Sequence, residues 1–164
     1  MENKENNYAF IDSQNVNMGV EELGWKLDFR KFIIYLKEKY SVKIAYLFIG
    51  YLPENQNLYA NLQKYGYVLV FKPVMKDGGG KPKGNVDADL VLRTMVEYCK
   101  YDKAVIVSSD GDFYSLVEHL YGKGKLKAVL SPNKEKCSIL LRKKARERMF
   151  FMDTLRGKLE YIKR

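Results

Sequence analysis

The chain has 164 residues, of which 46% are hydrophobic and 13% aromatic; these values exclude a disordered chain and fit one domain with a normal core. No apolar run reaches the ~18 residues needed to cross a bilayer, and the polar segment Met1–Asn7 has no signal-peptide pattern, so we expect a cytoplasmic protein. The net charge of +9 favours a polyanionic partner, such as RNA, DNA or an acidic membrane surface, although it also fits a basic protein with no such partner.

Short β-branched and aromatic runs alternate with amphipathic stretches along the chain. In chain order, the runs that predict strands are Tyr8–Ile11, Val42–Ile49, Tyr67–Phe71, Ala104–Val107, Leu126–Leu130 and Met149–Met152. Between them, helices are predicted from apolar residues at helical spacing, which are Phe29, Phe32, Ile33 and Leu36; Leu58, Leu62 and Tyr65; Leu90, Val91, Met95 and Val96; and Phe113, Leu116, Val117 and Leu120. Asp28 is expected to cap the first of these helices and Gly66 to end the second.

The last part of the chain predicts a helix over Ser138–Ala145 and a basic tail that could also be helical. The segment Lys76–Asn85, KDGGGKPKGN, has no apolar residue and predicts a mobile loop. Cys99 and Cys137 lie far apart without metal-ligand spacing, so both are expected to be reduced. Alternating strands and helices of these lengths predict one α/β domain with a mainly parallel central sheet covered on both faces.

Five aspartates stand where such a fold would gather them. Asp12 directly follows the first strand, and Asp110 and Asp112 follow the strand Ala104–Val107. Asp87 and Asp89 begin the helix after the glycine-rich segment. Because ligands of doubly wound sheets bind beyond the carboxyl ends of the strands, we expect these carboxylates to converge if the first strand and Ala104–Val107 are neighbours.

Gathered carboxylates repel one another, and a divalent cation removes that cost. Ligands that are all oxygens suit Mg²⁺ or Mn²⁺, and such an ion can promote phosphodiester hydrolysis. Other roles stay open: Asp12 could cap a turn, and Asp112 could simply cap a helix. Asp87 and Asp89 lie about 200° apart around a helix, so only one should face the site, and we favour Asp87.

Several polar residues are candidates for substrate contacts. Asn15 could hydrogen-bond a scissile phosphate, or form an Asx turn. Lys76, Lys81 and Lys83 could contact a nucleic-acid backbone, or belong to a solvated loop, and the same two interpretations apply to the basic run Arg142–Arg148. His119 is the only histidine and is interpreted as an ordinary helix residue, which leaves no His-based triad with strong support.

Three strings in the sequence resemble the NYN domain, the LabA-like branch of the PIN-like nucleases. In chain order they are FIDSQNV, KGNVDADLVLRTM and VSSDGDF, and the resemblance extends over about Tyr8 to Leu155. The resemblance implies a PIN-like three-layer α/β/α sandwich, Mg²⁺ or Mn²⁺ bound by aspartates, and metal-dependent ribonuclease activity. By motif, the implied site residues are Asp12, Asn15, Asp87, Asp110 and Asp112. Asn85 is inserted into what is often Lys-Gly-Val-Asp, which leaves Asp89 open as a ligand in place of Asp87.

The leading hypothesis is therefore an endoribonuclease in which Asp12, Asp87 and Asp110 hold the metal, and Asp112 or Asp89 supports it. The expected partner is nucleic acid, with RNA first, rather than a membrane, and a homodimer is allowed. The alternatives are a nucleic-acid-binding or nucleotide-binding module without turnover, and a scaffold or regulatory subunit.

Overall fold

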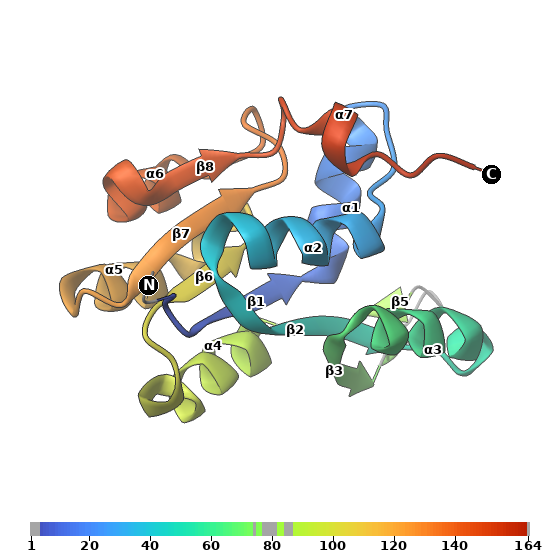
Figure 1. The fold of residues 1–164 in the computed structure, drawn as a ribbon, viewed down its shortest axis with the longest axis horizontal. Coiled ribbons are helices and arrows are strands. Elements are labelled where there is room, and N and C mark those ends of the chain that lie inside the picture. Colours follow the sequence, from blue (N-terminus) through green and yellow to red (C-terminus); the bar gives the residue numbers. More distant parts are fainter. Residues whose placement is uncertain (1–3, 74, 77–81, 84–86, 164) are drawn as a thin grey trace.

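The computed structural model describes residues 4–73, 75–76, 82–83 and 87–163, with side chains described for 4–72 and 87–163. Six strands form one sheet in the order β3-β2-β1-β6-β7-β8, and every neighbouring pair is parallel (Figure 1). The strands are β1 Asn7–Asp12, β2 Val42–Tyr51, β3 Tyr67–Pro73, β6 Ala104–Val107, β7 Leu126–Ser131 and β8 Met149–Phe151. All six predicted strands are confirmed, with ends that differ by two residues at most.

Seven α-helices lie among the described residues: α1 Ser13–Glu22, α2 Phe29–Tyr40, α3 Gln56–Tyr65, α4 Asp87–Val96, α5 Tyr114–Gly122, α6 Ile139–Ala145 and α7 Arg156–Leu159. The two predicted caps are confirmed, since the Asp28 carboxylate accepts the N–H groups of Arg30 and Lys31, and Gly66 ends α3 with a φ of 111°. Among the described residues, no helix is long and apolar enough to cross a membrane.

The sheet separates two apolar cores, which produces three layers. Along β1, Ala9 and Ile11 face one core, and Tyr8 and Phe10 face the other, as the two-residue period of a strand requires. Side chains of α1, α2, α3 and α7 fill the first core, and those of α4, α5 and α6 fill the second. The predicted α/β/α sandwich is therefore confirmed, with a sheet that is all-parallel rather than mainly parallel.

The predicted buried stripe of α4 is wrong in the last turn of the helix. Leu90 is buried as expected, but Met95 is 39% and Val96 60% exposed. Thr94, one turn after Leu90, is buried instead, and its hydroxyl donates to the Leu90 carbonyl at 2.7 Å. A threonine can occupy this core position because the helix backbone itself satisfies its hydroxyl.

The glycine-rich segment is not irregular throughout. Two short strands, β4 Met75–Lys76 and β5 Pro82–Lys83, form an antiparallel pair. The prediction of a loop over Lys76–Asn85 is therefore wrong at Lys76, Pro82 and Lys83. The sequence did not reveal these strands, because a strand of two residues is too short to show an apolar alternation. The rest of that prediction lies outside the described residues.

The strand order places a switch point between β1 and β6. From β1 the chain adds β2 and β3 on one side, and from β6 it adds β7 and β8 on the other. Because all six strands are parallel, their carboxyl ends meet at one edge of the sheet. The crevice at such a switch point is where open α/β sheets bind ligands.

Candidate metal centre

Asp12 lies at the carboxyl end of β1 and is only 5% exposed. By the alternation of the strand it shares the side of Tyr8 and Phe10, which is the side that α4 and α5 cover. Its Oδ1 accepts the N–H of Asn15 at 3.3 Å and so caps α1, and the hydroxyl of Ser108 lies 3.5 Å from Oδ2. Asp12 therefore caps a helix and also lies at the switch point, so the two interpretations of this residue are compatible.

The loop after β6 presents two more carboxylates. The N–H of Asp110 donates to the Ser108 hydroxyl at 3.1 Å, and Asp110 Oδ1 accepts the N–H of Asp112 at 2.8 Å. Asp110 thus caps the short 3₁₀ turn Gly111–Phe113 that leads into α5. The residue that precedes α5 is Phe113, and the start of α5 has no side-chain cap, so Asp112 does not serve as its cap.

The first residue of α4 completes a group of three. Carboxylate oxygens of Asp87, Asp110 and Asp112 all lie within 4.8 Å of one another. These residues come from two segments that are far apart in the sequence, and the switch point brings them together. Asp12 is outside this tight group but lies close enough for the charge of Asp110 to raise its pKa.

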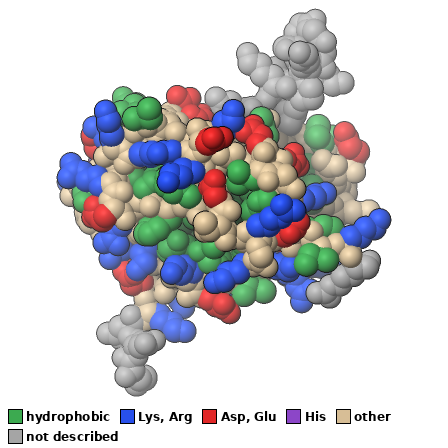
Figure 2. Space-filling model, turned by 90° about the horizontal axis from the view of Figure 1, so that it is seen from above, with side chains coloured by type: hydrophobic (Ala, Val, Ile, Leu, Met, Phe, Trp, Pro, Cys, Tyr) green, Lys and Arg blue, Asp and Glu red, His purple; other side chains and the backbone are tan. Residues whose placement is uncertain are grey.

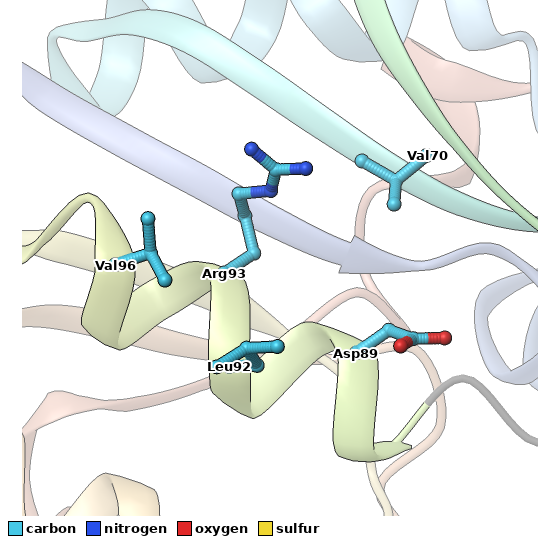
Figure 3. Close-up of a pocket in the computed structure, with 5 residues that line it drawn as sticks. All are labelled: Val70, Asp89, Leu92, Arg93 and Val96. Carbon is cyan, nitrogen blue, oxygen red and sulfur yellow. The ribbon is translucent and has the colours of Figure 1, made fainter.

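Asp89 lies apart from the group. It lines a separate hollow between α4 and β3 together with Val70, Leu92, Arg93 and Val96 (Figure 3). The cause is the helical geometry, since residues two apart point to different sides of α4. The structure thus places Asp87 rather than Asp89 with the other carboxylates.

The electrostatics of the group favour a cation. Burial, and then the charge of Asp110, raise the pKa of Asp12 to about 6. Burial, the charges of Asp110, Asp12 and Asp112, and a hydrogen bond with Asp110 raise the pKa of Asp87 to about 7. Both carboxylates thus resist ionisation in the metal-free protein, and a bound cation would relieve that resistance. Because all the donors are oxygens, the residues fit Mg²⁺ or Mn²⁺ better than a metal that prefers sulfur or nitrogen.

Asn15 is fixed beside the group by two hydrogen bonds. Its Oδ1 accepts the backbone N–H of Ser109 at 2.9 Å and the Ser109 hydroxyl at 3.0 Å. A backbone N–H can only donate, so the oxygen of the amide must face Ser109 and the Nδ2 group must point elsewhere. Sequence reasoning selected Asn15 but did not select its anchor Ser109, although both lie in the quoted strings.

The predicted basic contacts have mixed outcomes. Lys81 lies outside the described residues, and only the backbone is described for Lys76 and Lys83, so all three stay predictions. In the run Arg142–Arg148, Lys144 pairs with Glu118, and two arginines stack on aromatic rings, which are Arg142 on Phe151 and Arg146 on Tyr121. These internal contacts favour a structural role for that run.

Two other observations bear on the predicted surface. Figure 2 shows Lys and Arg side chains spread among acidic and apolar ones on the face seen there, without a single basic stripe. His119 is exposed on α5, where its ring lies 6.0 Å from that of Tyr98, and it is not one of the carboxylate group.

An all-parallel six-stranded sheet flanked by helices, with carboxylates gathered at its switch point, is consistent with the PIN-like class of α/β proteins. The NYN domain model matches residues 8–153, and the chain belongs to the NYN domain family, a PIN-like nuclease family whose substrates are nucleic acids.

Two known proteins are similar to this chain. The low amplitude and bright protein LabA of Synechococcus elongatus is 27% identical over 124 residues, which are 70% of this chain and 67% of LabA. The crystal structure of VPA0982, a protein of unknown function from Vibrio parahaemolyticus, has a TM-score of 0.79 at 22% identity and covers 97% of this chain and 99% of that one. LabA is thus a distant homologue, and VPA0982 shares the fold.

Proposed function

We propose that this chain is a metal-dependent endoribonuclease that hydrolyses RNA phosphodiester bonds. The observation that carries the proposal is the group of carboxylates at the switch point, in which three lie within 4.8 Å of one another and two have a raised pKa. Carboxylates held together against their repulsion are typical of functional sites. Membership of the NYN domain family supports a nucleic-acid substrate.

In this proposal Asp87, Asp110 and Asp112 hold Mg²⁺ or Mn²⁺, and Asp12 supports them from its buried position. When bound, such an ion polarises a phosphoryl oxygen, activates water and stabilises the leaving oxygen. The chain's own contribution is to hold the carboxylates in place through the strand ends and the 3₁₀ turn. Asn15 orients the substrate by donating from Nδ2 to a phosphoryl oxygen.

A cleavage assay tests this proposal. The purified chain is incubated with end-labelled single-stranded RNA, duplex RNA and single-stranded DNA, each with Mn²⁺, with Mg²⁺ or with EDTA. We expect internal cleavage of single-stranded RNA with either metal and none with EDTA. Binding of RNA without cleavage under any metal would identify instead a nucleic-acid-binding module of the same fold.

Replacement of Asn15 by Asp is expected to lower kcat by about 10²-fold, the usual effect of losing one donor to a developing charge. The new carboxylate can still accept from Ser109, so the loop stays anchored, but it has no Nδ2–H to donate. Steady-state cleavage kinetics measure the effect. Asn17→Asp is the matched control, because it makes the same change about 200° around α1. An equal loss in both variants would show that added charge, and not the lost donor, is responsible.

A further inference from the structure

A groove of about 320 Å³ opens beside Asp110 and is lined by α1, a helix that packs on the face of the sheet opposite to α4. One wall is a face of α1, formed by residues at positions i, i+3, i+4 and i+7, which are Asn15, Met18, Gly19 and Glu22. The other wall comes from two strand-end loops, through Ser109 and Gly111 after β6 and Lys136 and Ser138 after β7. The groove is thus continuous with the carboxylate group.

The buried side chain of Asn133 connects the two walls through hydrogen bonds. Its Nδ2 donates to the Gly19 carbonyl at 3.2 Å on α1, while its Oδ1 accepts the N–H groups of Glu135 and Lys136 at 3.1 and 3.4 Å. A buried amide that uses both of its ends in this way fixes the distance between two segments. Asn133 thus holds the loop after β7 against α1, and this contact sets the spacing of the two groove walls.

Two glycines allow the walls to approach closely. A Cβ on Gly19 would lie 2.7 Å from the ring of Pro132, and a Cβ on Gly111 would lie 2.5 Å from the Ser138 hydroxyl oxygen. The N–H of Ser138 also donates to the Ser109 carbonyl at 3.1 Å, which joins the two loops. The groove is therefore built and narrow before any ligand binds, a property that lowers the entropic cost of binding.

The groove presents one cationic and one apolar side chain, which could contact the phosphate and the base of a nucleotide. Lys136 is exposed and has no ion pair among the described side chains, so its ammonium is available for a phosphate. Met18 is 52% exposed and offers a polarisable apolar surface for the face of a base. A single strand suits such a groove better than a duplex, because the bases of a duplex are stacked and are not free to enter.

The hollow between α4 and β3 is a poorer candidate for the same ligand. It is smaller, about 240 Å³, and its one cation is already used. Arg93 pairs with Glu97 at 3.5 Å and lies over the ring of Tyr46.

From these observations we infer that the groove between α1 and the loop after β7 binds one nucleotide of single-stranded RNA next to the scissile phosphate, with Lys136 on a phosphate and Met18 against the base. This inference rests on the proposed function and names the path of the substrate, which runs toward α1 and away from α4.

The test uses the full chain in metal-free buffer and a short fluorescein-labelled single-stranded RNA of mixed sequence. Fluorescence anisotropy gives Kd at several salt concentrations for wild type, Lys136→Ala and Met18→Glu. Lys123→Ala is the matched control for charge, since Lys123 is an exposed lysine just before β7, at the opposite edge of the sheet. Leu92→Glu is the control for Met18→Glu, because Leu92 is an exposed apolar residue of the α4 hollow.

We expect Lys136→Ala to weaken binding several-fold and to reduce the slope of log Kd against log salt by about 0.7, the value for one contact on a single strand. Met18→Glu should also weaken binding several-fold, while both controls should bind like wild type. Equal effects of Lys136→Ala and Lys123→Ala, or a larger effect of Leu92→Glu than of Met18→Glu, would overturn the inference. Cleavage measured with Mn²⁺ on the same proteins is a separate readout. If the variants differ in RNA binding as expected but the wild type cleaves no RNA, the proposed nuclease activity is contradicted and the inferred nucleotide site is supported.

Discussion

Asp110→Asn is expected to reduce Mn²⁺-dependent cleavage of single-stranded RNA by at least about 100-fold, which corresponds to roughly 3 kcal/mol, without unfolding the protein. Asp110 is one of the three carboxylates that lie within 4.8 Å of one another, and its replacement removes one charge from the proposed metal site. The local fold should persist, because an asparagine oxygen can still accept the N–H of Asp112 and cap the 3₁₀ turn.

The matched control for this variant is Glu38→Gln. Glu38 is an exposed carboxylate on α2, so its neutralisation makes the same change in net charge away from the site. Thermal melting shows whether each variant is folded, and initial cleavage rates give the loss. Full activity of Asp110→Asn, or an equal loss in Glu38→Gln, would remove Asp110 from the catalytic group.

Asp12→Asn is expected to stabilise the metal-free protein at pH 8. Burial raises the pKa of Asp12 to about 6, so the ionised side chain costs the fold on the order of 2 to 3 kcal/mol at that pH. An asparagine avoids this cost and can still cap α1. The gain should appear as a rise in Tm of about 2 to 4 °C per kcal/mol.

The direction of the pH dependence follows from the same shift. The pKa of Asp12 is higher in the folded protein than in the unfolded chain, so the folded state binds more protons between pH 4 and 6 and stability falls as pH rises through that range. The advantage of Asp12→Asn should therefore shrink between pH 6 and pH 4 and nearly vanish below pH 4.

Melting curves in EDTA across this pH range provide the measurement, with Glu38→Gln as the matched control for the loss of one carboxylate. Added Mn²⁺ should raise the Tm of wild type at pH 8 more than that of Asp12→Asn. A lower Tm for Asp12→Asn at pH 8 in EDTA would show that the Asp12 carboxylate is stabilised by its surroundings.

The sheet was predictable because buried parallel strands leave short, nearly continuous apolar runs such as Ala104–Val107. The position of Asp12 and Asp110 at strand ends was enough to predict their convergence, once neighbouring strands were assumed. Helix α1 was not predicted, because its buried side chains are few and small, with Gly19 and Val20 among them. Its face nonetheless forms a wall of the groove.

Other features depend on contacts between distant segments, which a sequence pattern does not contain. Asp87, and not Asp89, lies with the other carboxylates because of how α4 is rotated about its axis against the sheet. The same rotation leaves Val96 exposed. The role of Asn133 is visible only when α1 and the loop after β7 are seen together. These are cases in which tertiary packing, not local propensity, decides the outcome.

The central claim is that the carboxylates at the switch point hold a divalent metal ion. The most direct measurement is a crystal structure of the protein soaked with Mn²⁺, with anomalous diffraction used to locate the ion. We predict an anomalous peak within coordination distance, about 2.0 to 2.3 Å, of carboxylate oxygens of Asp87, Asp110 and Asp112, and its loss in Asp110→Asn crystals. Wild-type crystals soaked at the Mn²⁺ concentration used in the cleavage assay that show no peak at these three residues would contradict the proposed metal site.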